Sequence, residues 1–511
     1  MCPVCAPFHR SLVSSVLALA TFRNAARGAI VSVMVVRFEL NDEPIVVEHV
    51  DPHVTLLEWL RASGRTGTKE GCAEGECGAC AVALLDRDVA GRSCLSAVNS
   101  CLLPLPAVHG RSVISVEGIA GSSGALHPVQ RAMIDCGGSQ CGYCTPGFIV
   151  SLFCEYYRPS RAGYDPEAIS GNLCRCTGYR PIAQAARSLP ILDASDPSDP
   201  RAAWLARAEP SLPAFEHAHT GVRYLRPESL VQLFALWTAH PNATLIAGGT
   251  DLLVYTNQRD TRYPVLIALD AVTELRTLQL ETNGLSIGAA LPLSQLEASL
   301  GGPDASEWRL LAQLLPLFSS RLIRNRATLG GNLCTASPIG DSAPALLVLD
   351  AALTLCRADG MRRLPLADFF LDYRKSALGE RELVRSVHLP RPAPRIQEFY
   401  KVSKRVLDDI STVSAAFALD LDAARRVERL RIAFGGVAST PLRAQAVEQA
   451  AQGQAWNEQT VERLGQLLAG VGTPLSDHRG SAQYRRALLP KLLEKFYLSS
   501  VHALEQSAGR S

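Results

Sequence analysis

The sequence predicts a multidomain α+β protein, and three observations point to this class. The chain has 511 residues, which at roughly 150 residues per domain corresponds to three or four domains. Eleven of its 15 cysteines fall between Cys72 and Cys176, so one part of the chain is chemically distinct from the rest. Strand-like and helix-like apolar patterns also dominate in different stretches, as expected for successive domains of mixed type.

Composition excludes several classes of function. The chain has 51 Lys and Arg against 49 Asp and Glu, and 47% of its residues are apolar. Such a balance gives neither the basic surface of nucleic-acid-binding proteins nor a polybasic membrane patch. The longest mostly apolar stretch, residues 12–22, is shorter than the roughly 20 residues of a membrane span. An odd number of cysteines in a large chain argues against disulfide stapling, so we expect a soluble, cytoplasmic protein with metal-binding cysteines.

Residues 1–33 form an N-terminal extension without Asp or Glu and rich in Arg, Ser and Ala. This composition is typical of a targeting segment. We favour the alternative that translation starts at Met34, because a strand pattern from Val33 to Leu40 begins there. The Cys2 and Cys5 pair in this extension is weak evidence for a site.

The first domain is expected over residues 34–107. After the strand ending at Leu40, Asn41-Asp42 predicts a turn and residues 44–50 a second strand. Residues 55–63 have the apolar spacing of a helix, and Gly64 follows at the position that favours helix termination. A further strand is expected over residues 79–85, before a turn at residues 86–91. These elements predict an α+β domain built around the first cysteine group.

A small helical domain is expected over residues 108–190. His127-Pro128, Thr145-Pro146, Asp165-Pro166 and Arg180-Pro181 each place a proline in the first turn of a helix, which predicts four helices. Residues 191–218 are rich in Pro, Asp, Ser and Ala, and this composition predicts a linker.

Two more domains are expected after the linker. Within residues 219–395, strand-like runs at 243–247, 265–269, 285–289 and 352–356 alternate with helical stretches, which predicts an α/β domain. Residues 396–511 contain a strand pattern at 430–434 and helical patterns at 444–468 and 482–497. We expect a smaller α+β domain there.

The first cysteine group reads Gly71-Cys72-Ala73-Glu74-Gly75-Glu76-Cys77-Gly78-Ala79-Cys80. Cys-x4-Cys-x2-Cys with a distant fourth cysteine is the spacing of plant-type [2Fe-2S] clusters. The glycines permit the left-handed turns that bring three thiolates of one loop together. Structural zinc sites favour paired knuckles instead, so we expect a cluster held by Cys72, Cys77 and Cys80. Spacing alone leaves the fourth ligand open between Cys94 and Cys101.

The second cysteine group consists of two pairs, Cys141 with Cys144 and Cys174 with Cys176. Each pair precedes an expected helix, with a threonine as candidate N-cap. The positive ends of two helix N-termini would then face one site, which suits an anionic iron–thiolate cluster. A Cys-x-Cys pair is a poor zinc knuckle, so a second [2Fe-2S] cluster is predicted. We expect Cys136, Cys154 and Cys356 to be small buried apolar residues, and Cys94 and Cys334 have no assigned role.

Two glycine loops stand out in the predicted α/β domain. Residues 245–253 form an apolar strand that runs into Gly248-Gly249-Thr250, and residues 328–333 contain Gly330-Gly331-Asn332. Exposed backbone N–H groups in such loops can hold a pyrophosphate. Neither loop has the spacing of a Rossmann or a P-loop motif, and tight turns are the alternative explanation for each. In a chain with two predicted clusters, the loops favour a flavin as their ligand, because a flavin exchanges electrons singly with clusters and in pairs with a nicotinamide.

Taken together and in this order, the two cysteine groups, the Val98-Asn99-Ser100-Cys101 segment and the glycine loops resemble the xanthine dehydrogenase/molybdenum hydroxylase family, and within it the iron–sulfur and FAD subunit. The resemblance covers residue 34 to about residue 500. It implies a β-grasp plant-type ferredoxin domain, a four-helix [2Fe-2S] domain, an α/β FAD-binding domain and a small α+β C-terminal flavoprotein domain. The 33-residue extension has no counterpart in the family pattern.

The resemblance also implies a set of cofactor-binding residues. One cluster, nearer the flavin, would be held by Cys72, Cys77, Cys80 and Cys101, which settles the fourth ligand in favour of Cys101. The other, nearer the molybdenum, would be held by Cys141, Cys144, Cys174 and Cys176. FAD would be bound by Leu245, Ile246, Ala247, Gly248, Gly249, Thr250, Asp251, Leu252, Phe318, Thr328, Gly330, Gly331, Asn332, Asp341, Val384 and Lys401.

By the same resemblance, electrons would pass from a molybdenum cofactor through both clusters to FAD and then to NAD+ during oxidation of hypoxanthine or xanthine to urate. The molybdopterin cofactor would lie in a separate large subunit, in a heterotetramer of two small and two large subunits. No catalytic residue beyond the flavin is then expected in this chain. The Asp408-Asp409-Ile410 stretch is either a border of the nicotinamide site or a solvated turn, and no NAD motif decides between NAD+ and O2 as acceptor.

The sequence leaves two other functions open. The chain could be the equivalent subunit of an aldehyde, carbon monoxide or N-heterocycle dehydrogenase, because the substrate pocket belongs to the partner. It could also be a stand-alone iron–sulfur redox protein. About 300 residues beyond the cysteine groups, with two glycine loops, argue against the second reading.

Overall fold

The first domain is a five-stranded mixed sheet with one helix. In the computed structural model, which describes residues 35–120, 124–159, 161–192, 199–302, 304 and 306–508, the strand order is β2-β1-β5-β3-β4. The strands are β1 (Val36–Leu40), β2 (Glu43–Val47), β3 (Ala81–Arg87), β4 (Ser93–Asn99) and β5 (Ser112–Ile114). The N-terminal extension, its Cys2 and Cys5 pair and the start at Met34 lie outside the described residues.

Helix α1 (Leu56–Ala62) packs its buried leucines against this sheet, as the sequence pattern predicts. Thr55 and Glu58 form a capping box at its start, with the Thr55 amide donating to a Glu58 carboxylate oxygen over 2.7 Å. Gly64 has φ +84°, which a glycine adopts without strain directly after a helix. The helix therefore ends at the start of the long loop, residues 63–80, that contains the first cysteine group.

The helical domain has three α-helices, α2 (Pro128–Asp135), α3 (Thr145–Tyr156) and α4 (Arg180–Ser188). The helix predicted at Asp165-Pro166 begins there, with Asp165 as its N-cap, but it is a short 3-10 helix over Pro166–Ile169. Gly171 follows this short helix and packs tightly on Ser320 and Leu322, where a Cβ would meet their side chains at 2.6–2.9 Å. Nearly every residue of α3 is buried, so this helix forms the core of the domain.

The predicted linker is more ordered than its composition indicates. Residues 200–207 form helix α5 (Pro200–Arg207), with the Asp199 carboxylate accepting hydrogen bonds from the amides of Arg201 and Ala202. The Tyr157 hydroxyl also donates to Asp199, over 3.0 Å. One polar residue of the predicted linker, Asp199, thus caps a helix and ties it to the helical domain.

The predicted α/β region contains two sheets. The first has the order β6-β7-β9-β8, with β6 (Phe215–His219), β7 (Val222–Arg226), β8 (Thr244–Ile246) and β9 (Val265–Ala268), and its last three strands are parallel. The second has the order β10-β11-β16-β12-β13, with β10 (Leu278–Glu281), β11 (Gly284–Gly288), β12 (Ala352–Arg357), β13 (Gly360–Pro365) and β16 (Leu383–Pro390). A short hairpin, β14 (Phe370–Asp372) and β15 (Lys375–Ser376), lies between β13 and β16 in the chain.

This region has seven α-helices among its described residues, two between strands of the first sheet and five between β11 and β12 of the second. They are α6 (Leu230–Ala239), α7 (Leu252–Arg259), α8 (Leu293–Leu300), α9 (Arg309–Leu314), α10 (Arg321–Arg324), α11 (Leu329–Cys334) and α12 (Ser342–Val348). Helix α7 directly follows the first glycine loop. The second predicted loop is wrong as a loop, because Gly330, Gly331 and Asn332 lie within α11 itself, after the Thr328 N-cap.

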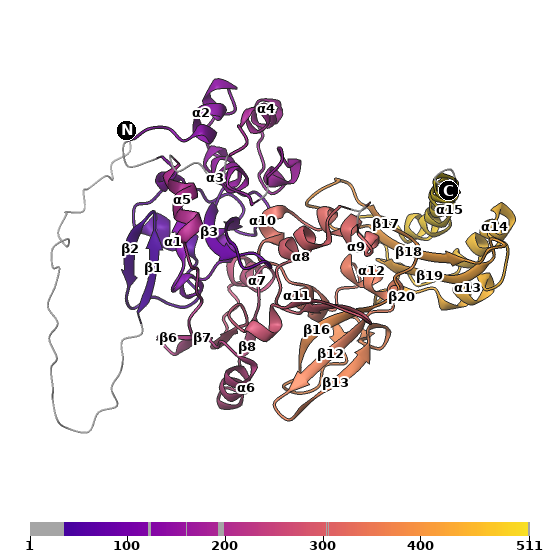
Figure 1. Ribbon diagram of the computed structural model, residues 1–511. Helices are drawn as coiled ribbons and strands as arrows, with labels where there is room; N and C mark the ends of the chain where they lie inside the picture. Colours follow the sequence, from indigo (N-terminus) through magenta and orange to yellow (C-terminus); the bar gives the residue numbers. More distant parts are fainter. Residues whose placement is uncertain are drawn as a thin grey trace, which may run out of the picture. The chain divides into compact units, whose positions relative to one another are not determined.

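The C-terminal domain is a four-stranded antiparallel sheet, β17 (Ile396–Val402), β18 (Val413–Leu421), β19 (Val427–Gly435) and β20 (Leu442–Arg443), covered by three helices (Figure 1). The single helix predicted over residues 444–468 is wrong, because α13 (Gln445–Ala451) and α14 (Glu458–Leu468) are separate. Gly453 has φ +72°, which breaks the helix, and the Asn457 side chain caps α14. Helix α15 (Ala482–Ala508) extends well past the predicted end at residue 497.

Within the described residues, no helix combines the length and apolar content that crossing a lipid bilayer requires.

Candidate iron–sulfur and flavin sites

The first cysteine group gathers four sulfurs in two pairs. Cys72 and Cys77 lie in the loop between α1 and β3, and their thiols are hydrogen-bonded. Cys80 lies at the end of the same loop, with its Sγ 3.4 Å from the Sγ of Cys101. This two-by-two arrangement suits a cluster with two irons, each of which takes two cysteine ligands.

Cys94 does not reach this group. It lies in β4, where it pairs with Asp86 of β3. Burial, with the nearby carboxylates of Asp86 and Asp88, raises the pKa of Cys94 to about 12, so its thiol stays protonated. The placement favours Cys101 as the fourth ligand, although both cysteines fit the linear spacing.

The loop conformation fits an anionic cluster. The amides of Glu74 and Cys77 point at the Cys72 sulfur, over 3.5 and 3.4 Å. The hydrogen bond from the Cys77 thiol lowers the pKa of Cys72 to about 5, which favours a thiolate there. A Cβ on Gly71 would lie 2.6 Å from the Cys77 sulfur, so only glycine leaves room for that sulfur. The backbone N–H donors at the Cys72 sulfur and the space left by Gly71 therefore both suit a [2Fe-2S] cluster.

The second cysteine group also forms two pairs. The thiols of Cys141 and Cys176 are hydrogen-bonded to each other, and so are those of Cys144 and Cys174. Cys144 is itself the N-cap residue of α3, in place of the expected threonine, because Thr145 already has helical geometry. The Thr177 amide donates to the Cys174 sulfur over 3.4 Å, so this loop also directs an N–H group at a candidate ligand.

The two cysteine groups are interlocked through their backbones. The Leu173 amide donates to the carbonyl oxygen of Cys77 over 3.0 Å, and the Asn172 side chain donates to the carbonyl oxygen of Gly78 over 3.2 Å. A Cβ on Gly147 of α3 would overlap that same Gly78 oxygen. The helical domain therefore packs directly on the loop of the first group.

Solvent exposure differs between the groups. Cys80 and Cys101 are 2% exposed, whereas Cys141 and Cys176 are exposed. Three large side chains near the second group are also exposed: Tyr143 (51%), Leu173 (44%) and Tyr179 (39%). The first group is thus half-buried at Cys72 and Cys77 and buried at Cys80 and Cys101, whereas the second is more exposed and lies beside apolar side chains.

The first glycine loop follows β8 and leads into α7. Gly249 has φ +78°, and a Cβ on Gly248 would overlap the carbonyl oxygen of Arg326, so both positions require glycine. The amides of residues 248–252 donate to no other described residue. Free amides at the start of an eight-residue helix form a cradle for an anionic group such as a pyrophosphate.

The second glycine loop lies against the first. Thr328 caps α11 by accepting a hydrogen bond from the Gly331 amide over 3.1 Å, and the Gly330 amide donates to Ala289 over 3.0 Å. A Cβ on Gly330 would lie 2.6 Å from the Ala289 side chain. Through the contact of Gly248 with Arg326, the structure brings the two predicted loops together.

Some of the other residues predicted to bind FAD contact one another in the structure. Lys401 in β17 forms an ion pair with Asp341 over 3.1 Å and donates to the Leu317 carbonyl, next to Phe318, over 2.8 Å. Asn332 is hydrogen-bonded to the Ser342 hydroxyl. Val384 lies in β16 within the hydrophobic core that also holds Leu329 of α11. Leu245 and Ile246 end β8, and Leu252 starts α7.

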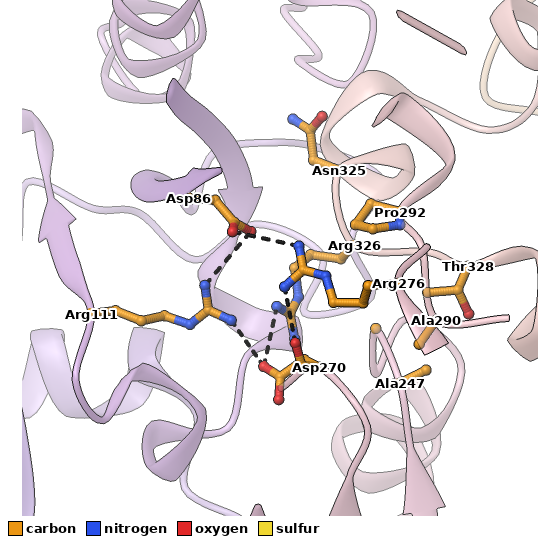
Figure 2. Close-up of a pocket in the computed structure, with 11 residues that line it drawn as sticks. Asp86, Arg111, Ala247, Asp270, Arg276, Ala290, Pro292, Asn325, Arg326 and Thr328 are labelled. Atoms are coloured by element: carbon orange, nitrogen blue, oxygen red, sulfur yellow. Dashed lines mark hydrogen bonds and ion pairs between the residues drawn. The ribbon is translucent and has the colours of Figure 1, made fainter. Parts of the chain in front are cut away.

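A buried charged cluster lies behind the glycine loops and was not predicted. Arg111 donates to Asp270 over 2.9 Å and lies 3.7 Å from Asp86, and Arg276 and Arg326 complete the group (Figure 2). These side chains, with Ala247, Gly248 and Thr328, line a cavity of about 20 Å³, room for one water molecule. No local pattern marks these residues, because they are spread over 240 positions of the sequence.

Protein-family models match most of the chain. Residues 38–104 match the 2Fe-2S iron-sulfur cluster binding domain, and residues 115–187 match the [2Fe-2S] binding domain. Residues 217–392 match the FAD binding domain in molybdopterin dehydrogenase, and residues 398–500 match the CO dehydrogenase flavoprotein C-terminal domain. The chain therefore has two [2Fe-2S]-binding domains and an FAD-binding domain.

Curated relatives are similar to most of this chain. Xanthine dehydrogenase 2 of Arabidopsis thaliana is 33% identical over 88% of this chain and 39% of its own length. Xanthine dehydrogenase of Emericella nidulans is 31% identical over 93% of this chain and 40% of its own length. Aldehyde oxidase 2 of Cavia porcellus is 32% identical over 92% of this chain and 40% of its own length. The chain thus spans about two fifths of the relatives that it matches.

Solved structures resemble part of the chain. Reconstituted CO dehydrogenase from Oligotropha carboxidovorans has a TM-score of 0.50 and 25% identity, over 53% of this chain and 94% of the solved chain. Quinoline 2-oxidoreductase from Pseudomonas putida 86 has a TM-score of 0.50 and 26% identity, over 55% of this chain and 96% of the solved chain. With the four domain matches and the full-length relatives, this likeness shows that the chain belongs to the molybdenum hydroxylase family of oxidoreductases, as its iron–sulfur and FAD-binding portion.

Proposed function

We propose that the chain is the electron-transfer subunit of a xanthine dehydrogenase, which passes electrons from a molybdenum subunit to NAD+ during oxidation of hypoxanthine and xanthine to urate. One observation supports this most strongly: this one chain, with both cysteine groups and the glycine segments, is similar over 88–93% of its length to curated xanthine dehydrogenases of a plant and a fungus. The interlocked loops then give a continuous protein path between the two cysteine groups.

In this proposal, Cys72, Cys77, Cys80 and Cys101 hold one [2Fe-2S] cluster, and Cys141, Cys144, Cys174 and Cys176 hold the other. The amides of residues 248–252 hold the FAD pyrophosphate, with Thr328 to Asn332 alongside. Bound clusters carry single electrons, and the flavin converts them to the electron pair that a nicotinamide accepts. Around these groups, the chain excludes water from Cys80 and Cys101 and directs backbone N–H groups at the ligand sulfurs.

The exposed second cysteine group supports an approach of the partner at that face. Tyr143, Leu173 and Tyr179 form an apolar rim beside Cys141 and Cys176, and such exposed patches are typical of protein contacts. We propose that this rim contacts a molybdopterin-binding large subunit, in a heterotetramer of two small and two large subunits. The more buried first group, which contacts α7, is the one nearer the proposed flavin site.

A second candidate is the equivalent part of another molybdenum hydroxylase. Aldehyde oxidase 2 is similar over the same length, and the solved flavoprotein chains come from CO dehydrogenase and quinoline 2-oxidoreductase. In this proposal the substrate pocket lies on the partner, so residues of this chain do not separate these activities.

The test is co-purification of the chain with its partner from the native host, followed by cofactor analysis and kinetics. We expect one FAD and four irons per chain, two distinguishable [2Fe-2S] EPR signals, a molybdenum-bearing partner and xanthine-dependent reduction of NAD+. Turnover of an aldehyde, CO or an N-heterocycle with no turnover of xanthine would favour the second candidate. Zinc in place of iron, or absence of flavin, would contradict both.

A further inference from the structure

Helix α7 joins the first glycine loop to the first cysteine group. The helix begins at Leu252, directly after the loop, and five residues later the Asn257 side chain reaches the cysteine loop. Its Nδ2 donates to the carbonyl oxygen of Ala73 over 2.8 Å and to that of Cys101 over 2.8 Å. Five residues of helix span about 8 Å, so one short rigid element touches both proposed cofactor sites.

The two carbonyls belong to different parts of the ligand set. Ala73 directly follows Cys72 and has φ +56°, a left-handed conformation that costs a non-glycine residue free energy. Cys101 comes from a separate 3-10 turn, Ser100–Leu102, after β4. Both amide hydrogens of Asn257 are therefore used, and they hold together two segments that are far apart in the sequence. One segment carries Cys72 of the first sulfur pair, and the other carries Cys101 of the second.

We propose that Asn257 is a positioning residue that fixes the first cluster relative to the flavin loop and raises its reduction potential. This inference rests on the proposed cofactors. The positive end of the amide group faces the peptide carbonyls of Cys101 and Ala73, and this favours the more negative, reduced form of a bound cluster. Polar groups that hold metal ligands in this way commonly change affinity or activity by 10–100-fold when removed.

Neighbouring contacts show why this one residue matters. Gln258 donates to the Cys72 carbonyl over 3.1 Å, but its side chain is exposed and makes a single such bond. Asn257 is half-buried and makes two. Asn325 supplies a matched control: its Nδ2 donates to the Ala97 carbonyl in β4 over 2.7 Å, across the same pair of domains but not at a ligand segment.

The experiment compares Asn257→Leu and Asn257→Asp with Asn325→Leu in the full chain with its cofactors. Asn257→Leu keeps the size and removes both donors, and Asn257→Asp keeps the shape and replaces the donors with oxygens that repel the carbonyls. Iron and FAD contents are measured first, then the midpoint potentials of both EPR signals by redox titration, and the rate of electron transfer between the first cluster and the flavin by rapid mixing.

We expect both Asn257 variants to lower the midpoint potential of one cluster only, and to slow electron transfer to the flavin about tenfold, with Asn325→Leu close to the wild type. Selective loss of that one EPR signal in one variant, with the other signal and FAD retained, supports the positioning role of Asn257, and the midpoint potential is then taken from the other variant. Unchanged potentials, or equal loss of both clusters in the Asn257 and Asn325 variants, would overturn it. Absence of [2Fe-2S] signals in the wild type would instead refute the proposed function, so the two failures are distinguishable.

Discussion

The carbonyl oxygen of Cys77 accepts a hydrogen bond from the amide of Leu173 over 3.0 Å. Leu173 directly precedes Cys174, so this single contact connects a proposed ligand of one cluster to the neighbour of a proposed ligand of the other. Gly78, Gly147 and Asn172 pack around the same point. The two iron–sulfur domains therefore fold around a shared backbone junction.

Replacement of the fourth ligand separates the two candidates that the spacing leaves open. Cys101→Ser removes a sulfur that lies 3.4 Å from Cys80, so we expect one of two [2Fe-2S] EPR signals to disappear. Cys94→Ser changes a thiol in β4 beside Asp86, and both signals should remain. EPR with iron analysis of the two purified variants checks this, and the reverse pattern would refute the ligand assignment.

Gly78→Ala should disrupt the junction between the cysteine groups. Gly78 has φ +65°, and a Cβ there would overlap the Gly171 carbonyl and lie 2.5 Å from the Asn172 side chain. We expect a loss of stability of about 2–4 kcal/mol, from backbone strain together with steric overlap. Gly91→Ala is the control, because Gly91 has φ +79° but a Cβ there would contact nothing within 4 Å. Chemical denaturation of both variants measures the difference, and equal losses would mean that the packing contributes nothing.

His127 should make the helical domain sensitive to acid. Burial lowers the pKa of His127 to about 4, from 6.5, while its ring caps α2 and contacts the Tyr157 hydroxyl over 3.0 Å. Because the folded-state pKa lies below the unfolded one, the stabilisation is complete above about pH 6.5 and is lost as the pH falls towards 4.

His127→Asn keeps an N-cap acceptor and removes the titration. We expect the wild type to lose roughly 2 kcal/mol more stability than the variant between pH 7 and pH 4, after allowance for the partial exposure of the ring. Thermal unfolding at a series of pH values provides the comparison, and parallel curves for the two proteins would contradict the assignment.

Asp270→Ala should destabilise the contact between the first iron–sulfur domain and the FAD-binding domain. Asp270 accepts from Arg111 and lies near Arg326, and its removal leaves Asp86 as the remaining carboxylate of the cluster in Figure 2. Removal of one partner from a buried ionic group costs about 3–5 kcal/mol. Lys491→Ala, which breaks an exposed pair with Glu494 of 2.7 Å, should cost less than about 1 kcal/mol. Comparable unfolding midpoints for the two variants would show that the buried cluster adds no stability.

Local sequence patterns were sufficient to predict a feature wherever all the residues that form it lie in one short segment. The Gly64 stop of α1, the cysteine loop at residues 71–80 and the first glycine loop were recognisable, because turn geometry depends on nearby residues. The loop expected at residues 328–333 was wrong, because Leu329–Cys334 forms α11. The same patterns failed where packing decides the outcome. Pro166 starts only a short 3-10 helix, and the expected linker contains α5, whose N-cap Asp199 also accepts a hydrogen bond from the distant Tyr157.

The sequence by itself determined which cofactor chemistry the chain can carry, because thiolates at fixed spacing and flexible glycines are properties of single loops. The tertiary structure decided which residues meet: Cys101 rather than Cys94 reaches the first loop, Leu173 joins Cys77, and Asn257 spans from the flavin loop to Cys101. Such contacts link positions up to 156 residues apart. They arise from the packing of whole domains, which no local pattern encodes.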